Sequence, residues 1–144
     1  MNWKLRVLAE AVAWKFVGLP YRWGGDDPMT GFDCSGLCIE ILKSVSVLPR
    51  KGDWTAQGLY DMFKDLGHLT KAKSGCLVFW KNKSKSRIVH VEYCIGRGTT
   101  IGASGGGSKT TSESAASAQN AFIKVRPIRT PYHAILDPFQ ELEP

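Results

Sequence analysis

The chain has 144 residues, of which 43% are hydrophobic and 22% are charged; this composition predicts one globular domain and excludes a disordered chain. The net charge of +6 favours anionic surroundings such as nucleic acid, anionic membranes or bacterial wall polymers, although a charge of this size also serves solubility alone. No apolar run approaches the ~20 residues of a membrane span and no nucleic-acid motif is present, so we expect neither a membrane span nor a nucleic-acid partner.

The first half of the chain carries helical signals. Residues 3–17 predict an amphipathic helix, whose apolar residues are interrupted by charged ones too often for a signal peptide. A second helix is expected from about Asp33, a suitable N-cap, to Val45. A third, shorter helix is expected over residues 55–66, where a glycine ends it.

The second half predicts an antiparallel sheet. Short apolar runs predict strands at residues 75–80, 88–95, 99–103 and 122–128. The lysine-rich segment Lys81–Arg87 is expected to be a solvated loop, residues 105–120 a mobile loop, and the tail from Pro131 irregular. N-terminal helices packed on a C-terminal antiparallel sheet predict an α+β fold in a single domain, residues 1–144.

Cys34 is the first candidate for chemistry. It follows a glycine turn in the run Gly31–Leu37, at the predicted start of the second helix. Backbone N–H groups at a helix start carry the positive end of the helix dipole, which favours the nucleophilic thiolate. The other cysteines, Cys38, Cys76 and Cys94, lie in apolar stretches and are expected to be buried. Without a Cys-x-x-Cys pair, and with scattered histidines, we expect neither a metal nor another cofactor.

Three histidines compete to be the base for this thiol. His68 follows the third helix in a loop and His133 lies in the tail, where surface positions are the simpler explanation. His90 lies within the strand at residues 88–95, amid apolar residues, so its ring needs a polar partner. A satisfied core histidine is the alternative. A cysteine at a helix start followed by a histidine on a strand is the layout of papain-like cysteine peptidases.

Several segments together resemble the NlpC/P60 family of cell-wall peptidases, over residues 18–103. Gly18–Gly25 is similar to the family's entry motif, and Gly31–Leu37 to its nucleophile motif at every position. Leu48–Arg50 follows at the expected distance, and His90–Gly96 resembles the histidine strand. Ser74–Phe79 resembles the preceding strand, but its Ser-Gly-Cys opening replaces the usual Pro-Gly-Asp.

The resemblance implies a papain-like fold and hydrolysis of peptidoglycan stem peptides, commonly at the γ-D-glutamyl–diamino acid bond. It implies that Cys34 is the nucleophile, forming a thioester, and that His90 is the base. Tyr21, Asp33 and Ser35 match positions that hold the free amino end of the stem peptide in relatives. Asp33 would serve equally as the helix cap alone.

One position departs from the family pattern. Members usually carry a third polar residue, often His, that orients the catalytic histidine. A hairpin centred on Gly96 would place His90 opposite Gly102, which offers no side chain. Glu92 shares the strand face of His90 and is the expected replacement. Facing-strand hydroxyls (Ser104 and Thr100) or a water molecule are the alternatives.

The missing orienter keeps other functions open. One alternative is an inactive or weakly active phage tail or assembly protein, with tail proteins as partners; another is a thiol amidase or acyltransferase. A phage lysin or virion-associated protein would explain how a chain without a signal peptide reaches the wall. A sequence trimmed from a longer protein explains it as well, so cellular location stays open.

Overall fold

The computed structural model describes residues 2–27, 31–107 and 109–140. Three helices precede the main sheet: α1 (Asn2–Lys15), α2 (Cys34–Ser44) and α3 (Ala56–Phe63), the last extended by a 3-10 turn at Lys64–Leu66. A two-stranded ribbon, β1 (Asp26–Asp27) and β2 (Gly31–Phe32), leads into α2. The N-terminal helices therefore fall where the sequence predicts them.

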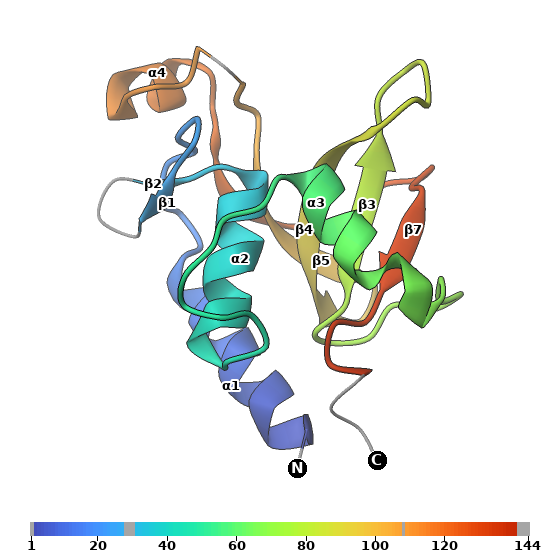
Figure 1. The fold of residues 1–144 in the computed structure, drawn as a ribbon. Helices are drawn as coiled ribbons and strands as arrows, with labels where there is room; N and C mark the ends of the chain where they lie inside the picture. Colours follow the sequence, from blue (N-terminus) through green and yellow to red (C-terminus); the bar gives the residue numbers. More distant parts are fainter. Residues whose placement is uncertain (1, 28–30, 108, 141–144) are drawn as a thin grey trace.

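Five antiparallel strands form the sheet, in the spatial order β6–β5–β4–β3–β7. Their bounds are β3 (Leu77–Lys81), β4 (Ile88–Gly96), β5 (Thr99–Ser104), β6 (Phe122–Pro127) and β7 (Ala134–Leu136). The helix α2 packs against β4 and β5, with α1 behind it and α3 beside the sheet (Figure 1). This arrangement confirms the α+β fold expected from the sequence.

Side chains cap two of the helices at their predicted starts. The Asp33 carboxylate accepts a 2.7 Å hydrogen bond from the Gly36 N–H at the start of α2. Thr55 Oγ1 accepts one of 3.0 Å from the Gly58 N–H at the start of α3. Each cap satisfies an N–H that the helix itself leaves unpaired, which fixes where the helix begins.

The two faces of the sheet differ in what they pack against. Phe79, Val91 and Tyr93 belong to the main core that the helices complete. Cys76 and Cys94 belong to a smaller apolar cluster. Because successive side chains of a strand point to opposite faces, Glu92 lies on the face away from that main core.

The hairpin of β4 and β5 corrects the predicted register. Tyr93 pairs with Ile101, and the two-residue turn is Arg97–Gly98, where both residues have positive φ (54° and 69°), instead of a turn centred on Gly96. An irregularity follows between residues 94 and 96. Continued along the strands, this register sets Glu92, not His90, opposite Gly102.

Two segments expected to be irregular contain regular elements. The predicted loop at residues 105–120 includes α4 (Glu113–Ala118), which Ser112 caps by accepting a 3.1 Å bond from the Ala115 N–H. The tail contains β7, whose three buried residues pair with β3. A capped six-residue helix and a three-residue strand are too short for periodicity to reveal, and β7 depends on a partner far away in the chain.

Candidate active site

Cys34 is the first residue of α2, held by close backbone packing around it. The β1–β2 ribbon delivers Asp33 as the N-cap, with φ −85° and ψ −177°. A Cβ at residue 36 would collide with the Gly25 carbonyl oxygen, so only glycine allows the first turn of α2 to approach the preceding loop this closely. The glycine of the nucleophile motif thus has a packing reason.

Two backbone donors beside the thiol have no acceptor. The N–H groups of Gly36 and Leu37 bond to Asp33. Within the described part of the chain, the N–H groups of Cys34 and Ser35 have no hydrogen-bond acceptor. Free N–H groups at a helix start can stabilise an oxyanion that develops near the thiol.

The His90 ring lies on β4 between its acidic neighbour and the thiol. Its Nε2 is 2.6 Å from Glu92 Oε2, which leaves Nδ1 as the nitrogen available to Cys34. The side chain is 21% exposed, and its ring centroid lies 5.4 Å from that of Trp80. Burial lowers the pKa of His90, but hydrogen bonding and charge interactions with Cys34 and Glu92 outweigh burial and raise it to about 9.

Glu92 is a buried carboxylate with four partners. Oε2 accepts from His90 and, at 3.0 Å each, from Arg126 and Arg129, while Oε1 accepts a 2.6 Å bond from Thr100. Burial raises the pKa of Glu92, but His90, Thr100 and Arg129 together hold it below its usual value. Its side chain is 1% exposed, so full pairing is what makes an ionised carboxylate tolerable here.

The other groups considered beside His90 lie differently. Thr100 hydrogen-bonds to Glu92 and to the backbone of Arg126, not to His90. The Ser104 hydroxyl is buried and has no hydrogen-bond partner among the described residues. Of the side chains considered, the structure brings only Glu92 to the His90 ring.

Sequence reasoning missed Arg126 and Arg129. Arg126 is paired with Thr100 across β5 and β6, which aims it at the carboxylate. Arg129 lies beyond the end of β6 and packs over the Trp80 ring at 4.9 Å, while Trp80 Nε1 donates to its carbonyl at 3.1 Å. Both contacts are non-local, and no local pattern near residue 92 would have indicated them.

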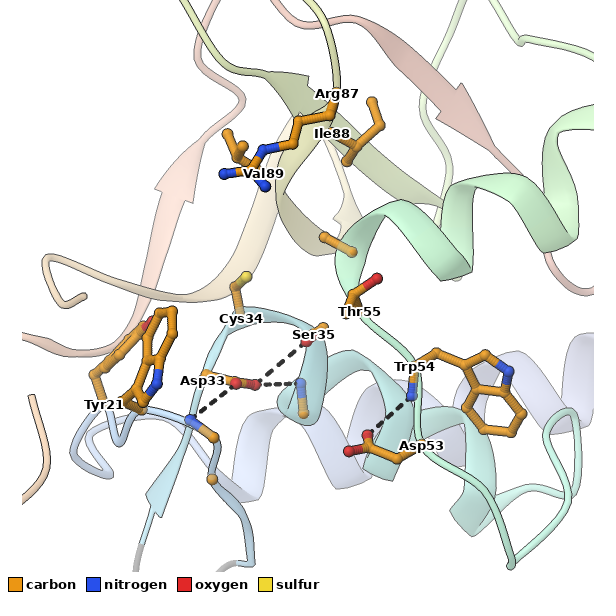
Figure 2. Close-up of a pocket in the computed structure, with 15 residues that line it drawn as sticks. Tyr21, Asp33, Cys34, Ser35, Asp53, Trp54, Thr55, Arg87, Ile88 and Val89 are labelled. Atoms are coloured by element: carbon orange, nitrogen blue, oxygen red, sulfur yellow. Dashed lines mark hydrogen bonds between the residues drawn. The ribbon is translucent and has the colours of Figure 1, made fainter. Parts of the chain in front are cut away.

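The three expected substrate residues line a cavity of about 590 Å³ that also includes Cys34 (Figure 2). Asp33 uses both carboxylate oxygens, one for Gly36 and the other for the Gly24 N–H at 3.1 Å. Burial raises its pKa and also raises that of Tyr21. The Ser35 hydroxyl lies 3.4 Å from the carboxylate.

The remaining histidines and cysteines lie elsewhere. His68 and His133 both contact the Tyr60 hydroxyl, at 2.9 Å and 3.2 Å. The other three cysteines (Cys38, Cys76 and Cys94) are buried and free, which confirms the predicted burial.

Two further features are absent from the described residues. Across residues 2–27, 31–107 and 109–140, no cluster of three or more His, Cys, Asp or Glu side chains suits a metal ion. None of the described helices is long and apolar enough to cross a membrane.

Comparison with known proteins gives consistent matches. The NlpC/P60 family model matches residues 18–127. Murein DD-endopeptidase MepH of Escherichia coli is 37% identical over 89 residues, which are 59% of this chain and 31% of that protein. Bifunctional muramidase/DL-endopeptidase CwlT of Bacillus subtilis is 38% identical over 100 residues, 68% of this chain and 28% of that protein. The chain thus spans less than a third of either relative.

Among solved structures, the NlpC/p60 domain of peptidoglycan hydrolase SagA superposes with a TM-score of 0.65 at 26% sequence identity. The match covers 92% of this chain and 97% of that domain. The similarity therefore extends over nearly the whole fold, and the family model itself reaches residue 127, beyond the segments that carried the sequence resemblance.

Proposed function

The chain belongs to the NlpC/P60 family, and from that membership we propose that it is a cysteine endopeptidase acting on peptidoglycan stem peptides. The observation that carries the proposal is the arrangement of Cys34 at the start of α2 beside His90 on β4, with Glu92 bonded to the far side of the ring. The named relatives are described as a murein DD-endopeptidase and a bifunctional muramidase/DL-endopeptidase.

The reaction follows from these positions. His90 Nδ1 takes the thiol proton, and the Cys34 thiolate attacks the scissile carbonyl carbon. The N–H groups of Cys34 and Ser35 stabilise the tetrahedral oxyanion. The C–N bond then breaks as the imidazolium returns its proton to the leaving amine, and a thioester remains on Cys34. Water, deprotonated by His90, hydrolyses the thioester and releases the acid.

Glu92 is proposed to orient the base. A carboxylate at 2.6 Å from Nε2 holds the ring and stabilises the imidazolium formed during the reaction. The inactive-protein alternative rested on the lack of a side chain at Gly102. Since Glu92 already contacts His90, the glycine at position 102 no longer favours an inactive protein.

None of the relatives named above is a phage protein, so a phage origin gains no support from them.

We further propose the γ-D-glutamyl–diamino acid bond as the one that is cut. Asp33, with Tyr21 and Ser35, would bind the free ammonium group of the stem peptide at the cavity wall beside Cys34. Burial of the Asp33 carboxylate supports this role, because an ion pair is stronger where water is excluded. The relatives' names include both DD- and DL-endopeptidases, so the bond requires a direct test.

Purified muropeptides provide that test. Wild-type protein should convert them to products whose masses identify the bond, while a Cys34→Ala variant of equal thermal stability leaves them intact. Rapid quenching should trap the acyl group on Cys34, identified by mass spectrometry. Unchanged muropeptides with wild-type protein would overturn the peptidase proposal. Acyl transfer to an added amine in place of water would indicate the acyltransferase alternative.

A further inference from the structure

Cys34 lies where two cavities meet. The larger, called here the Asp33 cavity, has a volume of about 590 Å³ and includes Asp33 and Asp53, with Arg87 also in its lining. The smaller, called here the arginine cavity, has about 380 Å³ and includes His90, Arg126 and Arg129. Both are lined by Tyr21, Trp23, Cys34 and Val89. A substrate bound at the thiol can therefore extend into both.

The arginine cavity carries an excess of positive charge. No carboxylate lines it among the described residues, and the Glu92 carboxylate behind it balances only one of the two guanidinium groups. Arg126 and Arg129 remain 31% and 41% exposed. Each has five N–H donors, of which Glu92 uses a single Nη2 group on each residue. Donors and charge are thus left over to face the cavity.

A second observation also indicates a ligand. Ser104 lines the arginine cavity and is 8% exposed, and its buried hydroxyl has no hydrogen-bond partner within the described residues. A buried hydroxyl is costly when it stays unpaired. Gly105–Gly107 continue this wall; the Asn120 carbonyl and the Tyr21 ring fill the space beside Gly105 and Gly106, whereas the space beside Gly107 is open.

We propose that Arg126, Arg129 and Ser104 form a subsite for a carboxylate that the substrate carries close to the scissile bond. The identity of that carboxylate rests on the proposed function. The α-carbon of a γ-linked glutamyl residue bears two branches, the amide leading to the amino end and a free α-carboxylate. The first branch enters the Asp33 cavity and the second enters the arginine cavity.

The subsite distinguishes substrates in a simple way. An α-linked peptide has no free carboxylate at this carbon, and an isoglutamine residue carries a neutral amide in its place. A carboxamide keeps the shape but loses the charge-assisted hydrogen bonds to guanidinium. The arginines thus select γ-linked glutamate over both, whereas a role confined to holding Glu92 would give no such selectivity.

Two alkylating agents probe the charge of the subsite without any peptidase reaction. Iodoacetate and iodoacetamide differ only in carboxylate against carboxamide, and both form an S–C bond to Cys34 as iodide leaves. The measured quantity is the ratio of their rate constants at Cys34. We expect Arg126→Gln and Arg129→Gln each to lower that ratio several-fold, and about tenfold together. Arg50→Gln, an exposed arginine paired with Glu40, is the matched control and should leave it unchanged.

An unfolded fraction would react with its own ratio, so thermal unfolding must show that each variant is folded at the assay temperature. Protonated His90 also attracts iodoacetate, so the ratio in the wild-type protein does not by itself show a subsite. The test is whether the ratio is lower in the arginine variants than in the Arg50→Gln control. An unchanged ratio in both arginine variants overturns the subsite, whatever the outcome of the peptidase assay.

Peptides test which carboxylate is bound. L-Ala-γ-D-Glu-L-Lys and its isoglutamine counterpart should differ about tenfold or more in kcat/KM with wild-type protein, and the arginine variants should bring the two values together. If the carboxamide is cleaved equally well, the glutamate assignment is wrong. If wild-type protein cleaves neither peptide, the muropeptide assay decides the peptidase proposal. Calorimetry with Cys34→Ala then decides the subsite separately, through tighter binding of the carboxylate peptide.

Discussion

Glu92 fills the space that a side chain at position 102 would need. A Cβ on Gly102 would lie 2.5 Å from Glu92 Cγ, and the same Glu92 carboxylate reaches His90 Nε2 at 2.6 Å. The glycine and the glutamate are therefore two parts of one arrangement. The orienting group comes from the strand that carries the histidine, and the facing strand supplies the room for it.

Replacing Gly102 by alanine should therefore impair catalysis through Glu92. The added Cβ forces the Glu92 side chain, and with it the His90 ring, to move. We expect kcat to fall at least about tenfold and stability to fall by about 1–3 kcal/mol, as for other overpacked sites. Steady-state kinetics and thermal unfolding measure the two effects.

Gly58→Ala is the control for that substitution, because its Cβ would meet only ordinary contacts at 3.4 Å or more. Wild-type kcat in a folded Gly102→Ala variant would show that Glu92 does not need this space.

The charge of Glu92 should set the alkaline limit of activity. Glu92→Gln keeps the shape but removes the negative charge that helps to raise the pKa of His90, and leaves Arg126 and Arg129 unbalanced nearby. The imidazolium of His90 is lost as pH rises through about 9 in the wild type, so the alkaline limb of the pH–rate profile should move to lower pH in the variant. We expect kcat to fall about 10²-fold.

The measurement is kcat/KM between pH 5 and pH 10 for both proteins. Glu92→Asp, which keeps the charge on a shorter side chain, should restore part of the alkaline limb. A parallel drop in rate without any shift of the limb would assign Glu92 a purely structural role.

The sequence located the cysteine half of the site better than the histidine half. Asp33 and Cys34 could be predicted because a cap and a helix start depend on residues within four positions of each other. The partner of Gly102 was predicted wrongly, since a two-residue turn at Arg97–Gly98 is not distinguishable from a turn centred one residue earlier. Arg126 could not be found, because its contact with Glu92 depends on pairing across three strands.

Asp33 has two proposed roles that one substitution separates. Asparagine caps helices about as well as aspartate but carries no charge, so Asp33→Asn should change the free energy of unfolding by less than about 0.5 kcal/mol. If the carboxylate also binds the ammonium group of the stem peptide, KM for a free-amine substrate should rise about tenfold or more.

The N-acetylated form of the same substrate is the internal control, because it carries no ammonium group and its KM should be nearly the same for both proteins. Equal KM values of wild type and variant with the free amine would leave Asp33 as a helix cap alone.

His90 should also make folding stability depend on pH. The folded protein raises the pKa of its imidazole from the ordinary histidine value of 6.5 to about 9, so the folded state binds the proton more tightly than the unfolded chain does. The resulting stabilisation is complete below pH 6.5 and is lost as pH rises through about 9.

The wild-type protein should therefore have a higher free energy of unfolding than His90→Gln, and this difference should be larger at about pH 6 than at about pH 9.5. We expect the difference to change by on the order of 2 kcal/mol between the two pH values. Urea unfolding of both proteins at the two pH values measures it, and His68→Gln serves as the control. If the difference in unfolding free energy between the two proteins is the same at both pH values, the pKa of His90 is not raised in the folded state.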